Sequence, residues 1–150
     1  MAGADEPCTL DSLLAEAARR IERHSPAEAL DAMRAGALLI DIRAGDDRER
    51  DGIVPGSLHI PRTVLEWRAA PGSRWRNPHI GGVERQVILL CDHGYSTVLA
   101  AATLVELGFT RAGDVVGGFA AWRDAGLPTG RAPLRRRGRD ELAGMTPPDP

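Results

Sequence analysis

One cysteine lies where a thiol could react rather than only pack. The segment QVILLCDHGYSTVLAAATLVELG, residues 86 to 108, begins as a branched apolar run that stops at Cys91, and an alanine-rich run begins a few residues later. A thiol attacks as its thiolate, which requires a pKa below the ordinary value of about 8.5. Backbone N–H groups at the start of a helix stabilise anions. The segment therefore predicts a strand, a loop and a helix, in which the loop holds a thiolate, an oxyanion or a persulfide at Cys91.

The residues after Cys91 bear on how well an anion would be held. His93 adds positive charge when it is protonated, whereas Asp92 opposes an anion if its carboxylate faces the sulfur. The other interpretation is that Cys91 only packs, since buried cysteine commonly behaves as a small apolar residue. No Cys, His and carboxylate cluster has metal-ligand spacing, and the sequence has no G-x-x-x-x-G-K-[ST] phosphate loop. We therefore expect no metal site.

Apolar runs and capping signals predict the elements that position this loop. Segment 9–24 predicts an amphipathic helix with Thr9 as its N-cap. Segment 25–36 predicts a second helix, with a capping box between Ser25 and Glu28 and an end at Gly36. Short apolar or extended runs predict strands at residues 37–43, 58–60, 86–90 and 114–118. Further helices are predicted at 63–70, 96–108 and 119–126, with loops over most of 44–61 and 71–85.

Apolar strands that alternate with helices are typical of an α/β fold whose parallel sheet is covered on both faces. The helix predicted at 96–108 is apolar nearly all round, so we expect it to be buried. In such sheets, ligand sites form beyond the carboxyl ends of the strands. Cys91 is predicted at one of these ends.

Composition limits the function further. The chain has 150 residues, enough for one domain with a core, and a net charge of -2, which gives no electrostatic case for a nucleic acid or an anionic membrane. No apolar run approaches the roughly 20 residues of a membrane helix. The start MAGADEPC lacks the pattern of a signal peptide. Two cysteines, Cys8 and Cys91, make no disulfide framework, so we expect reduced thiols and a cytoplasmic protein.

Four motifs occur in an order and spacing that point beyond general chemistry. They are DIR at 41–43, GIVPGSLHIP at 52–61, CDHGYST at 91–97 and GGFAAW at 117–122. Through them the chain resembles the rhodanese-like family of sulfurtransferases. The resemblance implies a three-layer α/β/α fold with a mainly parallel five-stranded sheet. It divides the chain into an N-terminal helical segment at 1–25, a rhodanese-like domain at 26–130 and a basic, then proline-rich, mobile tail at 131–150.

The resemblance also implies a chemistry that needs no cofactor. Cys91 would accept a sulfane sulfur from thiosulfate or a persulfide donor, become a persulfide, and pass the sulfur to a thiol, to cyanide or to a protein acceptor. The loop that follows would form the substrate-binding cradle, made of Asp92, His93, Gly94, Tyr95, Ser96 and Thr97. Asp41 and Arg43 are expected to pair and support a strand end, His59 to satisfy a local hydrogen bond, and Trp122 to anchor packing.

The chain departs from the family pattern at Ser96, where the family usually has an arginine that helps hold an anionic donor. The departure makes thiosulfate binding less favourable than in the pattern, although backbone donors can still stabilise a persulfide. We expect Arg62 or Arg68, in the segment after HIP, to supply the missing charge.

Two other functions remain open from the sequence. Phosphatases and arsenate reductases of related fold use a loop one residue longer, with arginine at the sixth position after cysteine, where this chain has Thr97. A guanidinium fork suits oxyanions, so its absence argues against them. The second alternative is a non-catalytic rhodanese-like module that binds a partner or senses redox state. The missing loop arginine favours such a module, and the retained Cys91 argues against it.

Overall fold

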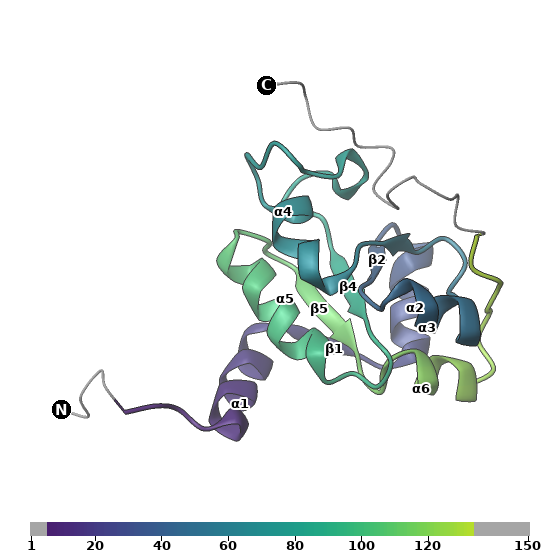
Figure 1. The fold of residues 1–150 in the computed structure, drawn as a ribbon, viewed down its shortest axis with the longest axis horizontal. Coiled ribbons are helices and arrows are strands. Elements are labelled where there is room, and N and C mark those ends of the chain that lie inside the picture. The colour runs from purple at the N-terminus through teal and green to yellow at the C-terminus, as the bar shows by residue number, and fades with distance from the viewer. Residues whose placement is uncertain (1–5, 134–150) are drawn as a thin grey trace.

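A computed structural model describes residues 6–133, and its centre is a five-stranded sheet (Figure 1). The strands lie in the order β1-β5-β4-β2-β3, and all the pairs between them are parallel. The fold confirms the predicted α/β class. The strands are β1 (Glu22–His24), β2 (Leu38–Asp41), β3 (Leu58–His59), β4 (Val87–Leu90) and β5 (Ala112–Val115).

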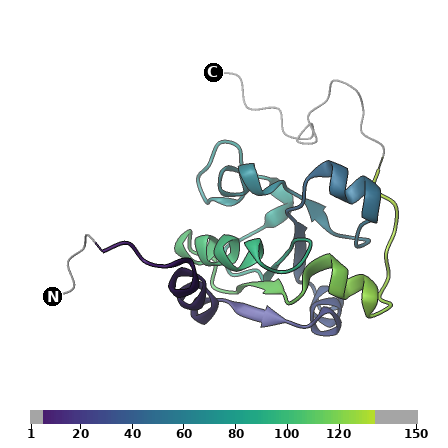
Figure 2. The same cartoon turned by 60° about the horizontal axis from the view of Figure 1, so that its bottom comes forward.

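Helices cover both faces of the sheet, as Figure 2 shows from below. The first face carries α1 (Leu10–Arg20), α4 (Leu65–Ala69) and α5 (Ser96–Glu106), and the second carries α2 (Pro26–Arg34) and α6 (Gly118–Asp124). A short helix, α3 (Gly45–Asp51), follows β2, and single 3-10 turns lie at Arg62–Val64 and Pro78–Ile80. In the part of the chain that the structure describes, no helix is long and apolar enough to cross a membrane.

The strands β2 and β4 carry apolar residues that pack on both faces of the sheet, as expected where both faces are covered. Ile40 and Leu89 belong to the cluster under α4 and α5, whereas Leu39 and Ile88 belong to the cluster under α2 and α6. Trp122 is fully buried in the second cluster, and its indole N–H donates to the Pro128 carbonyl over 2.9 Å. This confirms Trp122 as a packing anchor.

Two elements differ from the prediction. The first helix ends at Arg20 instead of continuing to residue 24, because Ile21 turns extended and Glu22–His24 pairs with β5 as a strand. Its three polar or charged residues give no apolar alternation, so only the tertiary pairing reveals this strand. Residues 45–51 form α3 instead of a loop. The segment GDDRERD has no apolar face, and its buried Arg48 is held by Asp41 from β2 over 3.2 Å.

Local signals gave the other elements in the right order and of the right type, although the strand predicted at 114–118 lies at Ala112–Val115, with Gly117 and Gly118 at the start of α6. The predicted capping box forms, with Ser25 and Glu28 each accepting from the other's backbone N–H. Thr9 accepts from the Ser12 N–H and begins α1. The predicted boundary at residue 25 stays a prediction, although β1, which precedes it, is part of the sheet. The predicted mobile tail lies, from residue 134 onward, outside the described residues.

Candidate active site

Cys91 directly follows β4, and the loop after it leads into α5 at Ser96. The loop turns at Gly94, whose φ of 80° is a left-handed value that favours glycine. A Cβ at this position would lie 2.6 Å from the Gly117 nitrogen and 3.0 Å from the Val115 carbonyl oxygen. Both the turn and the close approach to the end of β5 therefore require a residue without a side chain.

The loop places hydrogen-bonding groups around the sulfur. The Gly94 N–H donates to Cys91 Sγ over 3.2 Å, and the Thr97 hydroxyl oxygen lies 3.5 Å from it. Cys91 is 7% exposed, and burial by itself raises the pKa of its thiol. Hydrogen bonds from Ser96, Thr97 and Gly94 outweigh that effect and hold the pKa below its ordinary value. The thiol is thus buried, and yet its pKa lies below the ordinary value.

The GGFAAW motif holds the backbone at the start of this loop. Gly117 and Gly118 both have left-handed φ values, of 77° and 61°, which bring the start of α6 against Cys91 and Asp92. The Phe119 N–H donates to the Cys91 carbonyl over 2.7 Å, and the Ala120 N–H donates to the Asp92 carbonyl over 3.0 Å. The motif therefore fixes the peptide groups on which the thiol depends.

The loop and its supports match a known family. The family model for the rhodanese-like domain matches residues 25–125, about two thirds of the chain. The chain belongs to the rhodanese-like domain family. It is similar to thiosulfate sulfurtransferase 16, chloroplastic, of Arabidopsis thaliana, with 31% identity over 77% of this chain and 98% of that protein. It is also similar to thiosulfate sulfurtransferase GlpE of Stutzerimonas stutzeri, with 34% identity over 65% of this chain and 82% of that protein.

A solved structure from Rhodopseudomonas palustris is similar along most of this rhodanese-like chain. It is that of a protein of unknown function, described as a possible tyrosine phosphatase. The two share 32% identity and a TM-score of 0.74, over 85% of this chain and 99% of that one.

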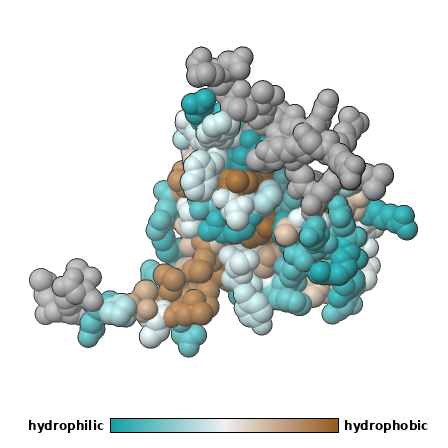
Figure 3. Space-filling view, viewed as in Figure 1, coloured by the Kyte–Doolittle hydropathy of each residue, from teal (hydrophilic) through white to brown (hydrophobic). Residues whose placement is uncertain are grey.

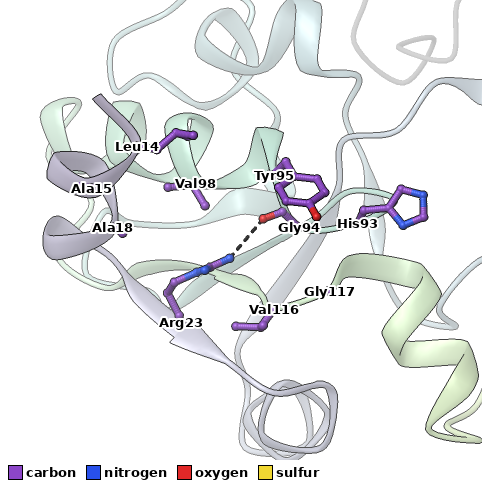
Figure 4. A pocket seen from close by; sticks show the side chains of 10 residues that line it. All are labelled: Leu14, Ala15, Ala18, Arg23, His93, Gly94, Tyr95, Val98, Val116 and Gly117. Atoms are coloured by element: carbon purple, nitrogen blue, oxygen red, sulfur yellow. Dashed lines mark hydrogen bonds between the residues drawn. The ribbon is translucent and has the colours of Figure 1, made fainter. Parts of the chain in front are cut away.

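The predicted cradle residues in the rhodanese-like loop differ in where they point. The Asp92 carboxylate lies 3.8 Å from Arg43 Nη1, on the side of the loop that faces the end of β2. Burial and the nearby Asp47 nevertheless raise the pKa of Asp92. The His93 ring points away from the cavity wall where Arg23 lies (Figure 4). Tyr95 is 76% exposed and stands at the rim.

The predicted pair of Asp41 and Arg43 is present and buried. Arg43 donates to both carboxylate oxygens, over 3.0 and 2.8 Å, and also to the Gly52 carbonyl. Its guanidinium lies over the Phe119 ring at 4.1 Å from the centroid. His59 Nε2 forms a local hydrogen bond with the Arg43 carbonyl over 2.8 Å, as predicted. The end of β2 is thereby tied to α6 and to the segment after α3.

The structure engages Arg62 and Arg68 in their own segment. Arg62 pairs with Glu66 one turn later, over 2.5 Å. Arg68 is buried and donates to the Trp75 carbonyl over 2.8 Å. Substrate binding by either residue stays a prediction. A different arginine donates a hydrogen bond to the backbone of the loop.

That arginine is Arg23 of β1, which the sequence did not single out. Its Nη2 donates to the Gly94 carbonyl over 3.1 Å (Figure 4), and its Nε and Nη2 donate to Asp114 of β5 over 2.9 and 3.0 Å. Asp114 is fully buried and accepts the Thr97 hydroxyl hydrogen over 2.8 Å. The contacts of Arg23 join residues 71 and 91 positions apart, so no local pattern could reveal them.

A cavity of about 500 Å³ lies between α1 and the loop (Figure 4). Arg23 and Tyr95 contribute polar groups to its wall. The first helix thus borders the loop as well as packing on α5, and apolar side chains gather over it in Figure 3. The apolar part of the cavity wall is formed by Leu14, Ala15, Ala18, Val98 and Val116.

Proposed function

We propose that this protein is a sulfurtransferase that carries sulfane sulfur as a persulfide on Cys91. The observation that supports it best is the Gly94 N–H aimed at Sγ from the loop between β4 and α5. The family membership and the relatives named as thiosulfate sulfurtransferases support the same reaction. The partners are a small sulfur donor and a thiol, cyanide or protein acceptor.

The reaction divides into two displacements at sulfur. The Cys91 thiolate attacks the outer sulfur of the donor. A new S–S bond forms on Cys91 as the donor's own S–S bond breaks. When the donor is thiosulfate, the leaving group is sulfite. An acceptor thiolate or cyanide then attacks the outer sulfur of the persulfide, and the Cys91 thiolate leaves. The lowered pKa of Cys91 favours both steps, because the thiolate is the nucleophile in the first and the leaving group in the second.

Loop charge bears on the choice of donor. Residues 92–97 contain no arginine, and Ser96 occupies the position where the family pattern has one. Persulfide donors, which carry less negative charge than the thiosulfate dianion, therefore lose less from the missing arginine than thiosulfate does. Thiosulfate stays among the proposed donors because the similar proteins carry it in their names.

Intact-mass measurement after incubation with thiosulfate or an alkyl persulfide tests the proposal. We expect a gain of one sulfur in the wild type and in Cys8→Ser, which removes the other, exposed cysteine. Cys91→Ser should show no gain, and added cyanide should remove the sulfur from the wild type. A wild type that gains no sulfur from any donor would instead indicate the non-catalytic module.

Phosphatase chemistry is the second candidate, because the similar R. palustris protein is described as a possible tyrosine phosphatase. A phosphoryl group has three oxygens to bind, and a guanidinium fork in the loop would suit them. Thr97 stands at the sixth position after Cys91, and its hydroxyl is already bonded to Asp114. We therefore expect no hydrolysis of p-nitrophenyl phosphate. Turnover that depends on Cys91 would reverse the assignment.

A further inference from the structure

We propose that the ion pair between Arg23 and Asp114 controls the reactivity of Cys91 from outside the loop. Both residues act as positioning residues, because neither forms a hydrogen bond with the sulfur itself. Arg23 lies outside the matched residues 25–125, so the family match does not assign it. The inference rests on the proposed function only in taking Cys91 as the reactive group.

Arg23 reaches the sulfur along two short routes. On one, its Nη2 holds the Gly94 carbonyl over 3.1 Å, and the N–H of the same residue donates to Sγ. On the other, it holds Asp114, which accepts the hydroxyl hydrogen of Thr97, and that hydroxyl oxygen lies 3.5 Å from Sγ. A single guanidinium therefore supports both residues whose hydrogen-bonding groups lie next to the thiol, Gly94 directly and Thr97 through Asp114.

The Thr97 hydroxyl has only one hydrogen to share. The Asp114 carboxylate can only accept, so the 2.8 Å contact directs that hydrogen away from the sulfur. In this arrangement Thr97 presents a lone pair to Sγ, which suits the thiol S–H better than the thiolate. When Cys91 ionises, the hydrogen can turn toward the sulfur, because Arg23 still supplies Asp114 with two hydrogen bonds. The ion pair thus allows the Thr97 hydroxyl to accept from the thiol of Cys91 and to donate to its thiolate.

The charges of Asp114 and Arg23 also affect the ionisation of Cys91. Asp114 is fully buried, and a buried carboxylate near a thiolate opposes its ionisation. Arg23 offsets that charge and is itself attracted to the Cys91 thiolate. Removal of the cation and removal of the anion should therefore shift the ionisation of Cys91 in opposite directions. If the ion pair only stabilised the fold, removal of either partner should affect the ionisation of Cys91 in the same direction.

Other charged groups face the loop, and the test leaves them unchanged. Asp92 and His93 belong to the loop itself, and Arg43 faces it from the end of β2. On the α3 side, Asp47 and Asp51 act on Asp92. Because every variant below retains these groups, their contributions cancel in the comparison.

The experiment titrates the Cys91 thiolate by its ultraviolet absorbance and by alkylation with iodoacetamide, each in a Cys8→Ser background. Asp114→Asn should raise the thiolate-to-thiol ratio below neutral pH about tenfold, and Arg23→Gln should lower it about tenfold, as expected for one charge near a partly buried group. The double variant should return close to the wild type. Arg111→Gln is the matched control, since it breaks the exposed Arg111–Glu22 pair, which joins β1 to the start of β5.

Shifts in the same direction for Asp114→Asn and Arg23→Gln, or shifts no larger than that of Arg111→Gln, would overturn the proposal. If Arg23→Gln does not fold, the titration of Asp114→Asn tests the proposal alone. This variant is expected to fold, because the Arg23 guanidinium that loses its partner is partly exposed and can be solvated. The titration reads the thiol whether or not sulfur is transferred. Opposite shifts together with no sulfur adduct would therefore refute the proposed function and leave this inference standing.

Discussion

Replacement of Gly94 by alanine tests whether the loop geometry creates the reactive thiol. Gly72 provides a matched control, because its φ of 79° nearly equals the 80° of Gly94 and a Cβ there would meet nothing within 4 Å. Both substitutions place alanine in the left-handed region, which costs roughly 1–2 kcal/mol. Only Gly94→Ala adds a Cβ that lies 2.6 Å from the Gly117 nitrogen. The difference between the two variants isolates the loop contact from the backbone conformation.

The expected magnitudes follow from these contacts. Overpacking against backbone costs about 1–3 kcal/mol, so Gly94→Ala should lower the free energy of unfolding by about 2–5 kcal/mol and Gly72→Ala by about 1–2 kcal/mol. Displacement of the Gly94 N–H also weakens a hydrogen bond to the thiolate. Bonds to charged groups contribute about 1.5–3 kcal/mol, so the thiolate-to-thiol ratio should fall about tenfold or more.

Urea unfolding measures the first quantity, and the pH dependence of iodoacetamide alkylation measures the second. The rate at a fixed pH changes less than the thiolate ratio, because a thiolate of higher pKa is more nucleophilic. The midpoint of the pH profile is therefore the better measure, and it should move upward in Gly94→Ala only. If the two alanine variants lose equal stability and keep the same midpoint, the loop contact has no part in preparing the thiol.

Three other predictions concern donor choice, pH and packing. Ser96→Arg should raise kcat/KM for thiosulfate, a dianion, more than for an alkyl persulfide, which carries less negative charge. Equal changes in steady-state kinetics would show that charge at this position does not select the donor. Because the fold lowers the pKa of Cys91, ionisation of this thiol stabilises the folded state. This contribution to the free energy of unfolding should be complete above the unfolded thiol pKa of about 8.5, and it should be lost as the pH falls through the pKa of the folded protein. Urea unfolding of the wild type should show that pH dependence, and Cys91→Ala should lack it. Trp122→Phe should lower the free energy of unfolding by about 1–3 kcal/mol, through lost volume and the lost bond to Pro128, and a smaller change would remove Trp122 as an anchor.

Sequence reasoning succeeded where the cause of a structure is local. The capping box of Ser25 and Glu28 lies within four residues, and the apolar runs of β2 and β4 are continuous, so both could be predicted. Gly94 lies in the predicted loop, and its left-handed backbone turns that loop. The family motifs carried the rest of the site prediction, as far as the ion pair of Asp41 and Arg43.

It failed where a partner distant in sequence decides the structure. Residues 22–24 form a strand because β5 offers them a backbone to pair with, and their side chains give no sign of it. The same strand carries Arg23, so the missed element concealed the missed functional residue. Substrate binding by Arg62 or Arg68 stays a prediction, since their hydrogen bonds within their own segment do not test it.

The loop depends on its surroundings more than on its own side chains. Backbone N–H groups of α6 hold the carbonyls of Cys91 and Asp92, and Arg23 holds the carbonyl of Gly94. Each contact fixes a peptide group of the loop, so it does not depend on which side chain occupies position 96. It also means that residues 25–125, the extent of the family match, do not contain the whole site. A chain beginning at residue 25 would lack β1, and Asp114 would stay buried near the thiol without its cation. We therefore expect such a chain to show a lower fraction of Cys91 thiolate even where the other four strands still form the sheet.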